Sequence, residues 1–423
     1  MHHHKINAWL APANRSAPMS TNQSSVEIPY QRWFKFKEAF SPQFVLDMLG
    51  RGGLASGARC LDPFGGCGTT GIAAQFAGVH PILIEVNPFI ADLAEAKLTA
   101  YDIDALSDDF IRIRKAVRRG DVDADLSADA PQTLCEPGDG GRWVYPKEVM
   151  GQILRYRSAI EQLQSECNRR LLKVLLGSIL VGVSNVTVNG KGRKYRSNWL
   201  GQQRSARDVD AALHQAFLAA IHDISRFNRR ACSTYEIRRG SCLTELAWVD
   251  PVDYAIFSPP YPNSFDYTDI YNLELWLLGY LRTREDNRNL RQSTLRSHVQ
   301  LTMDYGCEPP PSAILRNTCA ELQSIRARLW DDRIPAMIAA YFADLHRLLI
   351  GLKARMKPSG RIVIVVGESS YAGIVVRSGH IIAQIARSEG YAVKRHVRLR
   401  AMRTSAQQGG EHELEERLIE LIA

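Results

Sequence analysis

The chain has 423 residues, 45% of them hydrophobic, and a formal net charge of +8. This length predicts a large core and more than one lobe, and the charge favours a polyanionic partner. The eight cysteines include no C-x-x-C pair, which argues against a zinc site or a redox pair. The longest apolar run, 171–183, is too short to span a bilayer, so we expect a cytoplasmic protein with reduced thiols, no metal and no membrane partner.

The first 27 residues are rich in Ser, Asn, Ala and Pro and lack the apolar core of a signal peptide. We therefore expect residues 1–27 to form a disordered tail. Further along, Ser41-Pro42 predicts the start of a helix, because proline is favoured in the first helical turn.

From residue 59 onward, strand patterns alternate with helix patterns, which predicts an α/β fold: a parallel sheet with helices on both faces. The segment 414–422 is compatible with either a helix or an edge strand. The expected strands are 59–62, 81–85, 235–239, 252–257, 360–367 and 391–399, and the expected helices include 69–77, 88–100, a long one from 335 and 378–388.

Two stretches interrupt this alternation. Residues 106–231 have mostly helical patterns with many arginines, and 282–334 form a second insertion, so we expect the sheet domain to comprise 28–105 and 232–423. The loop 188–199 combines glycines and aromatic residues with Lys191, Arg193, Lys194 and Arg196, which suits contact with nucleic acid phosphates and bases. A solvated surface loop is the alternative interpretation.

The segment 61–71 predicts a strand, a glycine loop and a helix start, with Thr69 or Thr70 as the expected cap. Gly66, Gly68 and Gly71 fit G-x-G-x-x-G, and a strand-end acid follows at 85, so the pattern alone permits an NAD-dependent dehydrogenase. Asp-Pro-Phe before the glycines argues against that class, as does the lack of a hydride-transfer site. A Ser-Pro-Pro-Tyr sequence at 258–261, after another strand, argues against it too.

Residues 62–70 resemble the S-adenosylmethionine loop of DNA amino-methyltransferases, and 258–261 resemble their catalytic motif in the Ser-headed form typical of N4-cytosine enzymes. Segments 33–42, 258–279 and 365–400 resemble the same family, so the likeness covers most of the chain outside the insertions. It implies a Rossmann-like methyltransferase sheet with helices on both faces plus helical insertions. S-adenosyl-L-methionine is then the cofactor, double-stranded DNA the partner, and the nucleoid the place of action.

The resemblance also implies roles for individual residues. The loop 64–70 would hold the methionine part of the cofactor, and Glu85 would accept hydrogen bonds from both ribose hydroxyls. Where the family often has Gly-Asp, this chain has Gly240-Ser241. The carboxylate that helps to bind the cofactor's adenine in the family is therefore replaced by a serine hydroxyl, which can still form a hydrogen bond. The expected cofactor-binding residues are Asp62, Phe64, Gly66, Gly68, Thr69, Thr70, Glu85, Asn87 and Ser241, and the expected catalytic residues are Ser258, Pro259, Pro260 and Tyr261.

In this interpretation a cytosine is flipped out of the duplex, Tyr261 stacks on it, and Ser258 and the carbonyl of Pro259 accept hydrogen bonds from its amine. Transfer is direct, and the absence of any Pro-Cys dipeptide argues against carbon-5 methylation. The assignment requires that the strand ends at 62 and 257 open into one cavity. The alternatives are an N6-adenine DNA methyltransferase, an RNA base methyltransferase, a catalytically silent DNA-binding module and the dehydrogenase. A cognate restriction endonuclease is a further expected partner.

Overall fold

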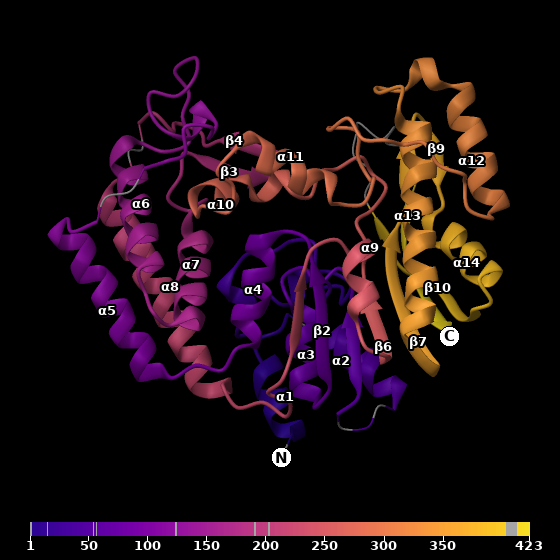
Figure 1. The fold of residues 1–423 in the computed structure, drawn as a ribbon, viewed down its shortest axis with the longest axis horizontal. Coiled ribbons are helices and arrows are strands. Elements are labelled where there is room, and N and C mark those ends of the chain that lie inside the picture. The colour runs from indigo at the N-terminus through magenta and orange to yellow at the C-terminus, as the bar shows by residue number, and fades with distance from the viewer. Residues whose placement is uncertain are drawn as a thin grey trace.

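A computed structural model describes residues 2–14, 16–53, 55, 57–122, 125–189, 192–201, 204–402 and 413–423. Within these residues, seven strands form one sheet in the order β5–β2–β1–β6–β7–β11–β10 (Figure 1). The strands are β1 (Arg59–Asp62), β2 (His80–Glu85), β5 (Glu236–Arg239), β6 (Val252–Phe257), β7 (Met356–Gly367), β10 (Ala392–Met402) and β11 (Leu414–Ile422).

The order of the strands is that of a doubly wound sheet. The five sheet strands β1, β2, β5, β6 and β7 run parallel to one another, and the strand order reverses direction between β1 and β6. Strand β11 inserts antiparallel between β7 and β10. This confirms the expected α/β class, and it settles 414–422 as an interior strand rather than a helix or an edge strand.

The central strands β1, β2 and β6 and the second half of β7 are buried on both faces, as expected for parallel strands. Successive residues of one strand enter different cores: Cys60 packs in one hydrophobic cluster and Leu61 in the other. The helices of the first face are α2 (Pro42–Gly52), α3 (Thr69–Ala77) and α4 (Pro88–Leu98), and those of the second are α13 (Ile334–Arg355) and α14 (Ser378–Ser388). Helix α13 alone among the described residues is long and apolar enough to cross a membrane, but 61% of its apolar window is buried in this core.

The N-terminal segment is folded where the structure describes it, so the prediction of a disordered tail over 1–27 is wrong there. Helix α1 (His2–Leu10) packs on α3. The Trp9 ring is fully buried and stacks on Phe76 with the ring centroids 4.1 Å apart, and its indole N–H donates to the Pro29 carbonyl. One buried tryptophan supplies a large apolar area, which the polar composition of the segment conceals.

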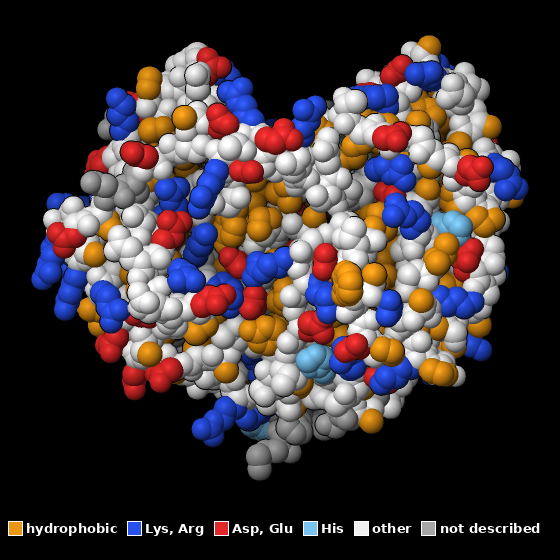
Figure 2. All heavy atoms as spheres, in the orientation of Figure 1, with side chains coloured by type: hydrophobic (Ala, Val, Ile, Leu, Met, Phe, Trp, Pro, Cys, Tyr) orange, Lys and Arg blue, Asp and Glu red, His pale blue; other side chains and the backbone are white. Residues whose placement is uncertain are grey.

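Two lobes rise on either side of the sheet (Figure 1). The first contains α5 (Ile103–Arg119), α6 (Lys147–Glu161), α7 (Glu166–Ile179), α8 (Ala206–Phe227) and the hairpin β3 (Val186–Asn189)–β4 (Gly192–Tyr195). Its two connections meet at Asn228, whose side-chain amide bonds both the N–H and the carbonyl of Tyr101. The second contains α12 (Ala313–Ser324), and α10 (Asn272–Leu277) and α11 (Arg284–Gln292) lie between the lobes. Figure 2 shows the surface hollowed between them.

Candidate active site

The two motifs meet where the strand order reverses. Strands β1 and β6 are parallel neighbours, with Cys60 opposite Tyr254 and Leu61 opposite Ala255, so the loops that follow them leave the same edge of the sheet. Crevices at such switch points are the usual ligand sites of doubly wound sheets. A cavity of about 290 Å³ lies there and is lined by residues of both motifs. The requirement that both strand ends share one cavity is therefore confirmed.

The predicted residues divide between this cavity and a smaller one beside it. Gly68 lines neither of them. The main cavity is lined by Phe64, Gly66, Glu85, Asn87, Ser241, Ser258, Pro259, Pro260 and Tyr261. The adjoining cavity, of about 30 Å³, is lined by Asp62, Thr69 and Thr70 together with Phe64, Gly66 and Ser258.

The glycine loop is held from within by a buried acid. The Asp62 carboxylate accepts the Phe64 N–H at 3.0 Å and the Thr70 hydroxyl at 2.6 Å, and burial raises the pKa of Asp62 to about 7. Thr70 is thus not a helix cap, nor is Thr69. Helix α3 is capped by Gly68 with φ +78°, where a Cβ would lie 2.9 Å from the Cα of Ala94.

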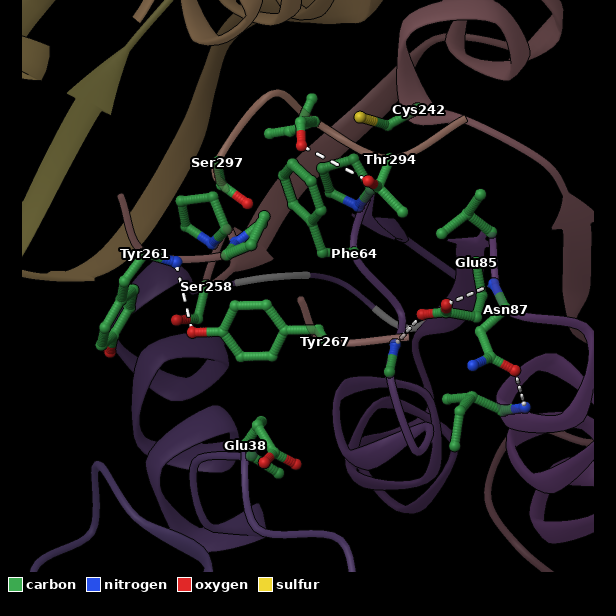
Figure 3. Close-up of a pocket in the computed structure, with 18 of the residues that line it drawn as sticks. Glu38, Phe64, Glu85, Asn87, Cys242, Ser258, Tyr261, Tyr267, Thr294 and Ser297 are labelled. Atoms are coloured by element: carbon green, nitrogen blue, oxygen red, sulfur yellow. Dashed lines mark hydrogen bonds between the residues drawn. The ribbon is translucent and has the colours of Figure 1, made fainter. Parts of the chain in front are cut away.

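Glu85 joins the end of β2 to the glycine loop (Figure 3). One carboxylate oxygen accepts the Gly66 N–H at 2.8 Å, and the other accepts the Asn87 N–H at 2.8 Å. Burial raises the pKa of Glu85 to about 7, and these backbone N–H groups partly offset that effect. Each carboxylate oxygen has a second lone pair, so Glu85 can still accept hydrogen bonds from a ligand in the cavity.

Asn87 and Ser241 stand at the ends of β2 and β5. The Asn87 side chain caps α4 by accepting the N–H groups of Phe89 and Ile90. Ser241 occupies the cap position of the short helix α9 (Cys242–Glu245), but its side chain makes no capping hydrogen bond. Its hydroxyl is therefore available at the edge of the cavity.

The Ser-Pro-Pro-Tyr turn is pinned by hydroxyl groups from two other elements. The Tyr341 hydroxyl on α13 donates to the Pro260 carbonyl at 2.7 Å, and the Tyr371 hydroxyl donates to the Pro262 carbonyl at 2.8 Å. Among the described residues, no group donates a hydrogen bond to the Pro259 carbonyl. Proline at both central positions fixes φ and removes N–H donors from the turn. The turn therefore presents carbonyl and hydroxyl acceptors at a fixed place.

Several residues of the cavity were not predicted as site residues, among them Phe36, Glu38, Tyr267 and Tyr271. The Tyr267 hydroxyl accepts the Tyr261 N–H at 3.4 Å, and Figure 3 shows its ring beside Ser258. Tyr271 donates to the Glu38 carboxylate at 2.7 Å and stacks on Phe36 at 5.6 Å. These side chains come from segments 33–42 and 258–279, whose family resemblance was the available signal.

Segment 293–298 of the second insertion also lines the cavity, and no motif in the sequence indicated this. Thr294 and Ser297 lie above Phe64 in Figure 3. The segment is anchored by Arg296, whose guanidinium donates to the buried Asp344 carboxylate at 2.7 Å. The second insertion therefore supplies part of the cavity wall near Phe64.

The residues predicted to contact nucleic acid differ in their exposure and in their hydrogen bonds. Lys191 lies outside the described residues, and Arg193 and Lys194 are exposed on β4. The Arg196 guanidinium instead donates to the backbone carbonyls of Ser184 and Val181 at 3.1 and 2.9 Å. Arg196 thus supports its own lobe rather than forming part of an exposed basic surface.

Comparison with known proteins finds relatives along nearly the whole chain. It is 27% identical over 417 residues to Type II methyltransferase M.AvaI of Nostoc sp. and of Anabaena variabilis, covering 92% of this chain and 85% of each relative. It is 24% identical over 435 residues to Type II methyltransferase M.BsoBI of Geobacillus stearothermophilus, covering 90% and 82%. The chain is therefore similar to Type II methyltransferases over the sheet domain and the insertions together.

No protein-family model matches the chain. Among solved structures, it is similar to TrmN from Thermus thermophilus, with 11% identity, a TM-score of 0.27 and coverage of 90% and 48% of the two chains. It is also similar to the rRNA methyltransferase AviRa from Streptomyces viridochromogenes, with 10% identity, a TM-score of 0.32 and coverage of 91% and 85%.

Proposed function

We propose that this protein is an S-adenosylmethionine-dependent DNA methyltransferase that modifies the exocyclic N4 amine of cytosine. The observation that carries the proposal is the shared cavity at the β1–β6 switch point, which joins the glycine loop and Glu85 to Ser258 and Tyr261. Similarity to Type II methyltransferases along almost the full chain supports the same class.

The residues of the cavity fit this cofactor. A buried acid at the end of β2 suits ribose hydroxyls, and Ser241 at the end of β5 suits the edge of an adenine. The N–H groups of Cys67 and Thr69 have no hydrogen-bond partner among the described residues, so they are available to a carboxylate at the start of α3. When bound, S-adenosylmethionine supplies an electrophilic methyl group on a sulfonium.

The chain's own contribution to transfer is orientation. The Ser258 hydroxyl and the free Pro259 carbonyl accept hydrogen bonds from the target amine, which turns the nitrogen lone pair out of conjugation with the ring. The Tyr261 ring offers a flat face to the base, and stacking of this kind contributes about 1–3 kcal/mol per base. That gain offsets the few kcal/mol needed to extrude the base. No protein nucleophile takes part, and orientation supplies the rate enhancement.

We assign target recognition to the first lobe, residues 106–231, and give the second insertion, 282–334, a supporting role. The exposed Arg193 and Lys194 lie on the hairpin at the rim of the hollow seen in Figure 2. Beside them Trp199 contacts both Trp143 and Tyr195, with ring centroids 4.9 and 5.0 Å apart. This combination of cations and aromatic rings suits a nucleic acid partner. We also propose a cognate restriction endonuclease and action at the nucleoid.

The experiment is incubation of the full chain with tritiated S-adenosylmethionine and either unmodified plasmid DNA or total RNA. Label in DNA, recovered as N4-methylcytosine by nucleoside mass spectrometry, is the expected result. N6-methyladenine in DNA would replace the base assignment, and label in RNA alone would replace the substrate class. A rise in melting temperature with NADH but not with S-adenosylmethionine would overturn the proposal.

A further inference from the structure

The ring of Tyr261 rests against the backbone of β7. A Cβ built on Gly367 would lie 2.5 Å from Cε2 and 2.8 Å from Cδ2 of Tyr261, closer than any real Cβ contact. The absence of a side chain at Gly367 therefore admits the ring. The Cδ2–Cε2 edge of the ring is therefore fixed beside the strand, which limits how the ring can turn toward a flat ligand in the cavity.

Gly367 begins a row of three residues that crosses three strands at one register. Gly367 on β7 pairs with Glu416 on β11, and Glu416 pairs with Arg400 on β10. The Tyr261 hydroxyl donates to Oε1 of Glu416 at 2.9 Å. Arg400 donates to the same carboxylate twice, from Nε to Oε2 at 2.8 Å and from Nη2 to Oε1 at 3.0 Å.

The burial of this row indicates that its bonds are not incidental surface contacts. Glu416 is 2% exposed, so its charge needs the fork of Arg400 to remain buried at acceptable cost. Arg400 also donates from Nε to the Ser20 hydroxyl at 3.1 Å. The side chains of Tyr261, Glu416, Arg400 and Ser20 all line the main cavity. The row thus ties the Ser-Pro-Pro-Tyr turn to the C-terminal hairpin and to the N-terminal segment.

We propose that Glu416 and Arg400 are positioning residues that hold the Tyr261 ring beside Gly367 and keep the ring aligned for stacking on the target base. The inference rests on the proposed function. A phenol fixed at both ends, by its backbone and by its hydroxyl, loses the freedom to swing into the space that the base must enter. Glu416 and Arg400 themselves do not touch the reacting atoms.

The test is a double-mutant cycle with Tyr261→Phe and Glu416→Gln in the full chain, assayed by tritium transfer to unmodified plasmid DNA. We expect each single variant to lower kcat about tenfold and the double variant to be no slower than the slower single one, because Tyr261→Phe removes, and Glu416→Gln weakens, the same charge-assisted bond. The Kd for S-adenosylmethionine, measured by calorimetry, should stay within twofold. Additive losses of kcat, or an unchanged kcat in Tyr261→Phe, would overturn the inference.

A matched control distinguishes the positioning of the Tyr261 ring from the general effect of removing a buried tyrosine hydrogen bond. Tyr391 is buried on the second face of the sheet and donates to the Leu349 carbonyl at 2.7 Å, outside the cavity. Tyr391→Phe should lower the melting temperature but leave kcat unchanged. A loss of kcat in Tyr391→Phe as large as in Tyr261→Phe would contradict a specific role for the row.

A second readout does not depend on activity. In protein labelled with 3-fluorotyrosine, the resonance lost in Tyr261→Phe identifies Tyr261. We expect Glu416→Gln to shift and broaden that resonance, and Tyr391→Phe to leave it unchanged. An unaltered Tyr261 resonance in Glu416→Gln would refute the positioning role even if methyl transfer to DNA is observed. Absence of transfer by the wild-type chain would count against the proposed function alone.

Discussion

Glu85 accepts the backbone N–H of Gly66 at 2.8 Å, so the acid at the end of β2 fixes the glycine loop that follows β1. The same carboxylate holds the N–H of Asn87 at the start of α4. One side chain therefore sets the separation of the two elements between which a ribose would bind. This arrangement makes Glu85 the most informative residue for testing the cofactor site.

Replacing Glu85 with Gln should weaken binding of S-adenosylmethionine about 10- to 100-fold, because hydrogen bonds to a charged group contribute about 1.5–3 kcal/mol. Isothermal titration calorimetry measures the change. The control is Glu389→Gln. The Glu389 carboxylate pairs with His346 at 2.7 Å and does not line the cavity, so this change should not affect the Kd for S-adenosylmethionine. Equal affinity in Glu85→Gln and the wild type would rule out the ribose role.

Cofactor affinity should depend on pH. Burial raises the pKa of Glu85 to about 7, and the ionised carboxylate is the better acceptor for ribose hydroxyls. The ionised fraction grows as pH rises through 7, so the Kd should fall about tenfold between pH 6 and pH 8. Because Asp62 also has a pKa raised by burial to about 7, the profile should be compared with that of Asp62→Asn. A profile that stays the same in Glu85→Gln would assign the effect to Asp62.

Ser241→Asp should tighten cofactor binding, up to about tenfold, by adding a carboxylate acceptor for the adenine amine at the end of β5. Ser241 lines the cavity and its side chain makes no capping bond, so the change breaks no contact within α9. Calorimetry with S-adenosylmethionine provides the measurement, and Thr244→Asp at the next turn is the comparison. An unchanged dissociation constant would show that Ser241 does not face the adenine.

Glu274 should make the fold less stable as pH rises. It is 3% exposed, one carboxylate oxygen lacks a hydrogen-bond partner, and burial raises its pKa to about 7. The folded state keeps the proton that the unfolded state releases near pH 4.5, so this contribution is full below 4.5 and is lost as pH rises through 7. Glu274→Gln should stabilise the protein by about 1–3 kcal/mol at pH 8 and change little at pH 5. Denaturation at both pH values is the measurement, and a lower stability of the variant at pH 8 would contradict this account.

Arg193→Ala combined with Lys194→Ala should weaken DNA binding and reduce the slope of log K against log salt by about 1.8, since each phosphate contact contributes about 0.9. Fluorescence anisotropy with a labelled duplex over a salt series measures both quantities. Arg118→Ala with Arg119→Ala removes two exposed charges from the end of α5, which Figure 1 places at the outer side of the lobe. An equal loss of slope in this control pair would show non-specific attraction only.

The sequence predicted the parts of the site that follow strands. The positions of Asp62 and Ser258 after buried apolar strands placed both motifs at one edge of the sheet, and the strand order brought them together. The hydrogen bonds at the start of helix α3 were less predictable. Asp62 competes for the Thr70 hydroxyl, so the helix start passes to Gly68, which a list of favoured capping residues does not reveal.

Contacts between residues far apart in the chain could not be predicted from the sequence. Glu416 meets Tyr261 only because β11 inserts antiparallel beside β7, and the pattern of 414–422 left open whether that segment is a strand at all. The folding of the N-terminal segment was missed because its composition is polar. The single buried side chain of Trp9, which packs it on the sheet domain, does not stand out in such a segment. In both cases the decisive contact joins residues that no local pattern relates.

The hydrogen bonds that Asn228 forms with both backbone groups of Tyr101 bear on how the first lobe could be exchanged between relatives. The first lobe leaves the sheet domain at Tyr101 and returns to it at Asn228, but it also packs on that domain: Asp223 of α8 accepts the Tyr30 N–H and pairs with Arg32. A chimera that takes residues 102–227 from a homologue would therefore need an acid at position 223 and a cation at position 170, which pairs with Asp92 and Glu95 of α4. The lobe and the sheet domain are thus constrained to change together at these buried ion pairs, whatever happens on the exposed face of the lobe.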